Sequence, residues 1–146
     1  MNRITSKKLF ASLILMVLVS CGTKEKQFIS AERHQNNLLR LRDMNSQMLG
    51  NLSKYGVNKN SGISLDFFFV TDDSMKAQSL ANELQATGYH VNRIHASPKD
   101  QSLWVLTGNA PMVNMDSSSL NKWTAAVCET GYKNDCELQG WSPVTE

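Results

Sequence analysis

The order of extended and helical segments restricts the fold of this chain more than any other feature. Residues 63–70 (ISLDFFFV) are branched and aromatic, which is typical of a β-strand. Three more strands are predicted at 89–94, 103–107 and 136–141, and two amphipathic helices at 74–87 and 117–129. The segments therefore follow one another as β-α-β-β-α-β.

Capping residues support these boundaries. Oxygen-bearing side chains at 71–73 precede one helix, Asp116 precedes the other, and Gly88 ends the first of them. A longer amphipathic helix is predicted at 31–55, between Ser30 as N-cap and Gly56. Its apolar residues recur every three or four positions: Leu38, Leu41, Met44, Met48, Leu52 and Tyr55.

Two split β-α-β units form an antiparallel sheet with two helices on one face. We therefore expect an α+β fold, a ferredoxin-like β-α-β-β-α-β sandwich preceded by an N-terminal amphipathic helix. The chain of 146 residues is long enough for one core and too short for two ordinary domains. The prediction is a single domain at 31–146, with the helix at 31–55 and the ferredoxin-like part at 63–143.

The first strand carries apolar residues on both of its faces. Ile63, Leu65, Phe67 and Phe69 share the face expected to pack on the helices, and Phe68 points the other way. On suitable registers Trp104 and Trp141 join Phe68, so something is expected to cover this second face. The candidates are the helix 31–55 or, alternatively, a second copy or a protein ligand. Phe68, Trp104 and Trp141 are the predicted partner-binding residues.

The first twenty residues have the pattern of an export signal. A short basic segment precedes eleven mostly apolar residues at 9–19, too few to span a bilayer. The sequence Leu18-Val19-Ser20-Cys21 then resembles the bacterial lipoprotein signal. That resemblance implies cleavage after residue 20, acyl chains on Cys21, and anchoring of the chain to a membrane.

Residues 21–30 are mostly polar and are predicted to form a lipidated tether. Gly22, where an aspartate would favour the inner membrane, points to the outer membrane, with the domain facing the periplasm. Removing the signal takes away three of the 15 basic residues and none of the 13 acidic ones, so the mature charge is near −1. Such a charge gives little reason to expect nucleic acid as a partner.

Cys128 and Cys136 enclose seven residues rich in turn formers. In an oxidising periplasm a disulfide between them is the favoured prediction. Two buried free thiols, or a metal pair, are the alternatives, and the absence of clustered histidines disfavours zinc.

Motifs for catalysis are absent from the sequence. It contains no HExxH, CxxC, G-x-S-x-G or phosphate-binding glycine loop. His34 is expected in solvent, and His90 and His95 are expected on opposite faces if their strand is regular. No catalytic residue, metal site or cofactor is predicted, and the protein is not expected to be an enzyme.

Several short features together resemble one family. They are the leucine-rich leading helix, the Asn- and Gly-rich break at 58–62, the aromatic strand that ends in Asp72-Asp73, Gly88-Tyr89-His90-Val91, and Gly140-Trp141. In order and spacing, over roughly 31–143, they resemble the regulator of ribonuclease activity B family, also called ribonuclease E inhibitor proteins. The resemblance implies a ferredoxin-like domain that acts by protein–protein contact. Cytoplasmic members bind a ribonuclease and modulate its action on RNA.

Two departures from the family change the expected function. The strongly acidic segments of the family are missing, and an exported chain would not meet a cytoplasmic ribonuclease. The leading hypothesis is a lipid-anchored, non-catalytic module that binds or inhibits an envelope protein. Alternatives are ribonuclease E regulation, immunity against a toxin, and a structural envelope role. Base stacking on Phe68 and Trp104 is disfavoured by the charge and by export.

Overall fold

A four-stranded antiparallel sheet forms the centre of the structure, a computed structural model that describes residues 26–144. Its strands are β2 (Leu65–Thr71), β3 (His90–Ala96), β4 (Trp104–Asn109) and β6 (Glu137–Pro143). They lie side by side in the order β3-β4-β2-β6. The first of these strands in the chain thus lies between the third and the fourth, which is the predicted ferredoxin-like arrangement.

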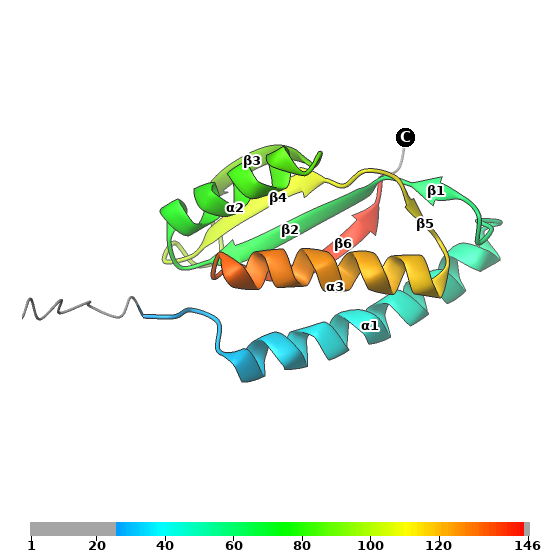
Figure 1. Cartoon of the computed structure of the whole chain (residues 1–146), viewed down its shortest axis with the longest axis horizontal. Helices are drawn as coiled ribbons and strands as arrows, with labels where there is room; N and C mark the ends of the chain where they lie inside the picture. Colours follow the sequence, from blue (N-terminus) through cyan, green and yellow to red (C-terminus); the bar gives the residue numbers. More distant parts are fainter. Residues whose placement is uncertain (1–25, 145–146) are drawn as a thin grey trace, which may run out of the picture.

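Helices α2 (Ser74–Ala86) and α3 (Ser117–Lys133) cover one face of this sheet (Figure 1). Both begin at predicted caps, since the carboxylate of Asp73 accepts from the N–H of Met75 and that of Asp116 from the N–H of Ser119. Gly88 follows α2 with a φ of 90°, a conformation that residues with a side chain rarely adopt.

The main core lies between the sheet and these two helices. Leu65, Phe67 and Phe69 point into it from β2 and are almost fully buried, as the strand pattern predicts. Burying a side chain of this size stabilises the fold by about 1.5–3 kcal/mol. The helices contribute four main apolar residues, Leu80, Leu84, Leu120 and Val127.

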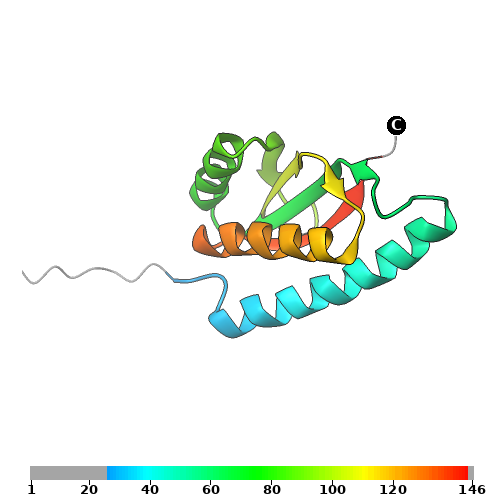
Figure 2. The ribbon, with the colours of Figure 1, turned by 45° about the vertical axis from the view of Figure 1, so that its right-hand side comes forward.

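Helix α1 (Ala31–Lys54) packs against α3 and β6 rather than across the second face of the sheet (Figures 1 and 2). The expectation that this helix covers the second face is therefore wrong. Ser30 is its N-cap, as predicted, and Leu41 is fully buried. Tyr55, assigned to the apolar face, is 86% exposed beyond the end of the helix.

Polar side chains explain the position of α1. The amide of Asn37 donates to the carbonyl oxygen of Leu138 at 2.8 Å, and the guanidinium of Arg40 donates to that of Gln139 at 2.8 Å. These carbonyls belong to β6, an edge strand of the sheet. Helix α1 thus satisfies an edge that would otherwise be open to another strand.

The predicted strand at 63–70 is interrupted at Ser64, whose hydroxyl donates to the carbonyl of Ala110 at 2.8 Å. Residues before the break form β1 (Gly62–Ile63), which pairs with β5 (Val113–Asn114) in a small second sheet. This pair lies at the far end of the molecule from the start of α1 (Figure 1).

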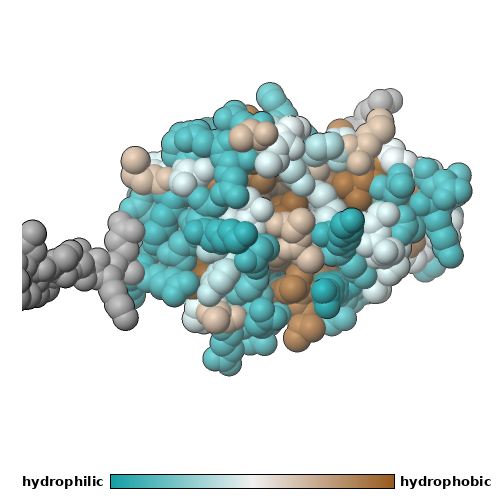
Figure 3. Space-filling view, in the orientation of Figure 1, coloured by the Kyte–Doolittle hydropathy of each residue, from teal (hydrophilic) through white to brown (hydrophobic). Residues whose placement is uncertain are grey.

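Seen from the side of the helices, the surface is mainly hydrophilic, with small hydrophobic areas between the elements (Figure 3). Within residues 26–144, no helix combines the length and the apolar character that a membrane span requires.

Candidate interaction surface

The sheet face that points away from α2 and α3 is the candidate site. Phe68 pairs with Thr107 of β4, and Val70 pairs with Val105, so these four side chains share that face. The outer strand β3 adds Arg93 opposite Thr107 and His95 opposite Val105. We call these residues the open face: Phe68, Val70, Arg93, His95, Val105 and Thr107.

Phe68 is the most exposed apolar side chain of this face. It is 43% exposed, whereas its neighbours Phe67 and Phe69 are at most 2% exposed. Its partner in β6 is Gly140, and a Cβ at that position would lie 3.6 Å from the Phe68 ring and 4.0 Å from the Met44 sulfur. Because glycine leaves this space free, the apolar surface of Phe68 extends towards Met44 of α1.

The two tryptophans predicted beside Phe68 point the other way. Trp141 pairs with Phe67 and is buried on the helix side, where its ring packs edge-on against Trp123 at 6.3 Å between centroids. Trp104 pairs with Thr71, which is also a residue of the helix side. The predicted cluster of Phe68, Trp104 and Trp141 is therefore wrong, and only Phe68 belongs to the open face.

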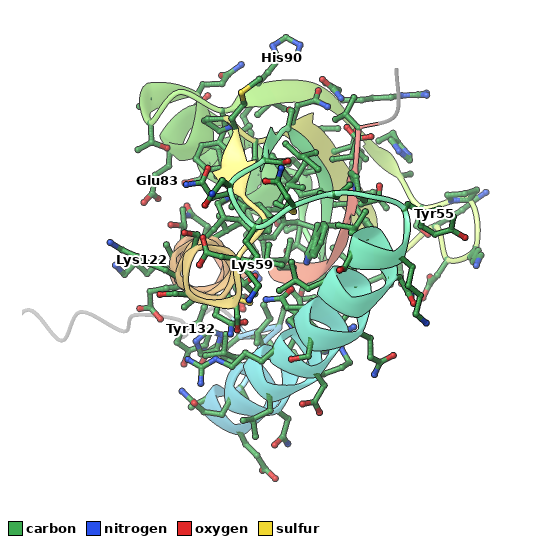
Figure 4. All side chains as sticks on the ribbon, turned by 90° about the vertical axis from the view of Figure 1, so that its right-hand side faces the viewer. Tyr55, Lys59, Glu83, His90, Lys122 and Tyr132 are labelled. Carbon is green, nitrogen blue, oxygen red and sulfur yellow. The ribbon has the colours of Figure 1, made fainter. Side chains whose placement is uncertain are left out.

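A β-bulge in β6 accounts for the position of Trp141, and a second bulge, in β3, accounts for another difference. Strand β4 pairs with β2 without a bulge, so the position of Trp104 follows from their regular register. In β6 the register shifts at Gln139, which places Trp141 under the helices. In β3 the register shifts at Asn92, so that His90 pairs with Asn109 and His95 pairs with Val105. The two histidines consequently lie on the same face, not on opposite faces as a regular strand would place them. Figure 4 shows His90 at the outer side of the sheet.

The carboxylates around the open face already have partners. Glu137 at the start of β6 forms an ion pair with Arg33 of α1. Asp66 accepts a hydrogen bond from the amide of Asn109 in the neighbouring strand. Arg93, in contrast, has no carboxylate within 4 Å among residues 26–144, and the same is true of Arg40.

A buried polar network holds α1 beside this face. The amide of Asn45, 1% exposed, donates to Asn121 and to the hydroxyl of Thr124, both at 2.9 Å. Its oxygen accepts from the indole N–H of Trp141 at 2.8 Å. A hydrogen-bonded asparagine inside a helix interface fixes how the two elements fit, since any slip would leave its amide unpaired. The apolar pattern of α1 gave no indication of this residue.

His34 also belongs to this interface, although it was expected in solvent. It is 8% exposed and stacks on the ring of Tyr132 at 4.3 Å between centroids. Its Nε2 lies 3.4 Å from a carboxylate oxygen of Glu129. Tyr132 extends from α3 towards α1 (Figure 4).

Phe28 and Ile29, which precede α1, are held to the domain by hydrogen bonds, and we call these two residues the entry segment. The carboxylate of Asp135 accepts from the backbone N–H groups of Phe28 and Ile29, both at 2.8 Å, and from the ammonium of Lys76 at 2.7 Å. Lys76 also bridges to Asp72 at 2.8 Å. Sequence analysis missed Asp135 because a turn aspartate gives no sign of a partner more than one hundred residues away.

The opposite charges of Lys76 and Asp135 stabilise each other. Burial disfavours the ammonium of Lys76, but its hydrogen bonds to Asp135 and Asp72 outweigh that cost and raise its pKa. Burial would likewise raise the pKa of Asp135, yet the bonds from Lys76, Phe28 and Ile29 hold it below its ordinary value of 3.8. Both groups are therefore charged at neutral pH.

The predicted disulfide between Cys128 and Cys136 is wrong, because both residues are free and buried. The sulfur of Cys128 lies towards α1, 4.0 Å from the amide of Asn37, while that of Cys136 donates to the carbonyl of Asn134 at 3.4 Å. Burial raises the pKa of the Cys128 thiol to about 11 and that of Cys136 to about 12. Both therefore remain protonated at neutral pH.

The described part of the chain holds no group of three or more metal-ligating side chains. The open face offers instead an exposed aromatic ring, aliphatic side chains and the guanidinium group of Arg93, with that of Arg40 beside it on α1. These groups suit contact with another macromolecule.

One protein family, described as regulator of ribonuclease activity B, has a model that matches residues 42–142. The chain belongs to this family. The match reaches all four strands of the main sheet and begins within α1. The entry segment of Phe28 and Ile29 therefore lies outside it. The family is described by an effect on a ribonuclease rather than by a reaction of its own. Among curated proteins, none matches the chain.

The residues on which the anchoring prediction depends lie outside the described part. They are the signal segment 1–20, Cys21 and the first half of the tether 21–30.

Proposed function

We propose that this regulator of ribonuclease activity B family domain is a non-catalytic module that binds a protein, and regulates or inhibits it, through its open face. The observation that carries the proposal is Phe68, a 43% exposed aromatic residue at the centre of a sheet face that no described element covers. Exposed aromatic residues within a polar surround are typical of protein-binding surfaces.

We place this module in the bacterial envelope, anchored by lipid on Cys21 to the outer membrane and facing the periplasm. The support is the basic start of the chain, the apolar run 9–19 and the residues 18–21. On this basis the partner is an envelope protein, and no nucleic acid is expected to bind.

The anchoring is tested by labelling cells with radioactive palmitate. The native chain should take up label and fractionate with the outer membrane, and Cys21→Ser should do neither. Unlabelled native protein in the cytosolic fraction would refute the envelope location.

The binding face is tested by placing a photo-crosslinking amino acid at position 68 in the full-length acylated chain in cells. Met75 is the matched control position, because it is 74% exposed but lies on α2, on the helix side. A defined adduct from position 68 that is absent from position 75 is the expected result. Equal adducts from both positions, or none, would exclude the open face.

Family membership favours a second function, regulation of a ribonuclease. Purified protein would then slow RNA cleavage by ribonuclease E, and Phe68→Ser would abolish the effect while Met75→Ser would not. No inhibition at a large molar excess would exclude direct action on this enzyme.

A further inference from the structure

We propose that the segment bound by the open face is an acidic stretch of protein chain. This inference rests on the proposed function and adds the chemistry of the partner. It follows from the distribution of charge around Phe68.

The centre of the proposed binding surface is apolar. Phe68 contributes an exposed ring, Val70 and Val105 lie beside it on the same face, and Met44 approaches across Gly140. A surface of this kind takes up one or two apolar side chains of a partner and excludes water around them. It does not by itself define the charge of the partner.

Guanidinium groups flank this centre on both sides. Arg93 of β3 faces Thr107, which in turn faces Phe68, so it lies two strands away, about 10 Å at the usual strand spacing. On the opposite side, Arg40 of α1 reaches the carbonyl of Gln139, next to the glycine that faces Phe68. An extended or helical segment lying across Phe68 would therefore meet a cation at either end.

The remaining charges of the face make an anionic partner the better match. Glu137 is paired with Arg33 and Asp66 is hydrogen-bonded by Asn109, whereas Arg93 and Arg40 lack carboxylate partners within the described chain. Guanidinium groups form strong, charge-assisted hydrogen bonds to carboxylates, with two parallel bonds where the whole group is free. The Nε and Nη2 groups of Arg40 already donate to Asn37 and Gln139, so its Nη1 group is the one left to face a partner.

A single-stranded RNA is the competing partner, because its bases can stack on Phe68 and its phosphates can contact the same arginines. The near-neutral mature charge disfavours it, because binding of RNA without sequence preference depends on a groove of excess positive charge along the phosphate backbone. We therefore infer a carboxylate-rich protein segment, and RNA binding becomes an outcome of the test.

The test uses the full-length acylated protein, purified from membranes in detergent, and fluorescein-labelled 12-residue peptides of alternating leucine with glutamate, glutamine or lysine. Fluorescence anisotropy should show tightest binding of the glutamate peptide, weakening as salt is raised. Arg93→Gln and Arg40→Gln should each weaken it about tenfold, and Phe68→Ser should abolish it.

Matched controls separate charge from folding. Lys122→Gln removes the same charge from α3 on the helix side (Figure 4) and should leave binding unchanged. Arg40→Lys should restore part of the affinity lost in Arg40→Gln. Equal binding of the lysine peptide, no loss in Arg93→Gln, or tighter binding of oligouridine than of the glutamate peptide would overturn the inference.

Sequencing the adduct captured from position 68 in cells distinguishes this inference from the proposed function. An acidic captured segment supports both. A neutral or basic captured segment refutes the acidic partner while the binding function stands, and no adduct refutes both.

Discussion

Phe67 and Phe68 are neighbours in β2, yet their surroundings differ greatly. Phe67 packs edge-on against Phe69 and Tyr89 and is almost fully buried beneath the helices. Phe68 is nearly half exposed on the other face. The helix-covered face therefore holds the fold together, and the open face is left free to interact. The family match spans residues of both faces, so membership of the family does not tell the two apart.

The largest effect should come from truncating the two phenylalanines separately. Phe67→Ala should lower the free energy of unfolding by about 3–5 kcal/mol, because it leaves a cavity in the core. Phe68→Ala should lower it by less than about 1 kcal/mol, because its ring is partly in water already. Urea unfolding followed by circular dichroism measures both. If the two variants lost similar amounts of unfolding free energy, the open face would also be part of the structural core.

Adding one methyl group should give a smaller contrast of the same kind. A Cβ on Gly131, in α3, would lie 2.5 Å from the Phe69 ring and 2.6 Å from the carbonyl of Cys136, so Gly131→Ala should cost about 2–3 kcal/mol. On the open side, Gly140→Ala meets only ordinary contacts and should change stability by less than about 1 kcal/mol. Urea unfolding measures the change in the free energy of unfolding for both variants. Equal losses of stability would show that the two faces are packed equally tightly.

Removing the charge of Asp135 should cost about 1–2 kcal/mol at pH 7, since three charge-assisted hydrogen bonds depend on it. Asparagine tolerates the positive φ of 55° at this position. Because the folded-state pKa is below 3.8, the stabilisation is complete above about pH 4 and is lost as pH falls through the folded-state value. The difference between native protein and Asp135→Asn should therefore shrink below pH 4. Asp43→Asn, at an exposed position of α1, is the control. A difference as large at pH 2 as at pH 7 would contradict this account.

The smallest expected effect is on the reactivity of the thiols of Cys128 and Cys136, which are both buried. The intact mass of the protein should correspond to two free thiols at positions 128 and 136. Iodoacetamide at pH 7.5 should label neither of them in the folded state and both in urea. Loss of two mass units on purification from the periplasm would show a disulfide instead.

The sequence was sufficient to predict the order of elements, because it depends on local signals. The caps at Ser30, Asp73 and Asp116 and the alternation of Leu65, Phe67 and Phe69 are all readable within a few residues. Such patterns determine which segments are helices and strands, and the order of strands then follows from the known split β-α-β topology.

The sequence was insufficient where one residue changes the register. A bulge adds a residue to a strand and reverses the side on which every later side chain lies. Trp141 was therefore predicted on the wrong face, and His90 and His95 were predicted on opposite faces although they share one. Such a shift depends on the partner strand and leaves no local trace. The position of α1 was equally hidden, because Asn37 and Asn45 look like surface residues until their partners on β6 and α3 are known.

The contact between Asp135 and the backbone of Phe28 and Ile29 also has a mechanical consequence. Any pull on the chain ahead of Lys26 is taken up at the end of α3 and the start of α2 before it can reach α1. Helix α1, which covers the edge of β6, therefore bears less of this force. Strand β6 would therefore keep its cover even when force acts on the chain at residue 28.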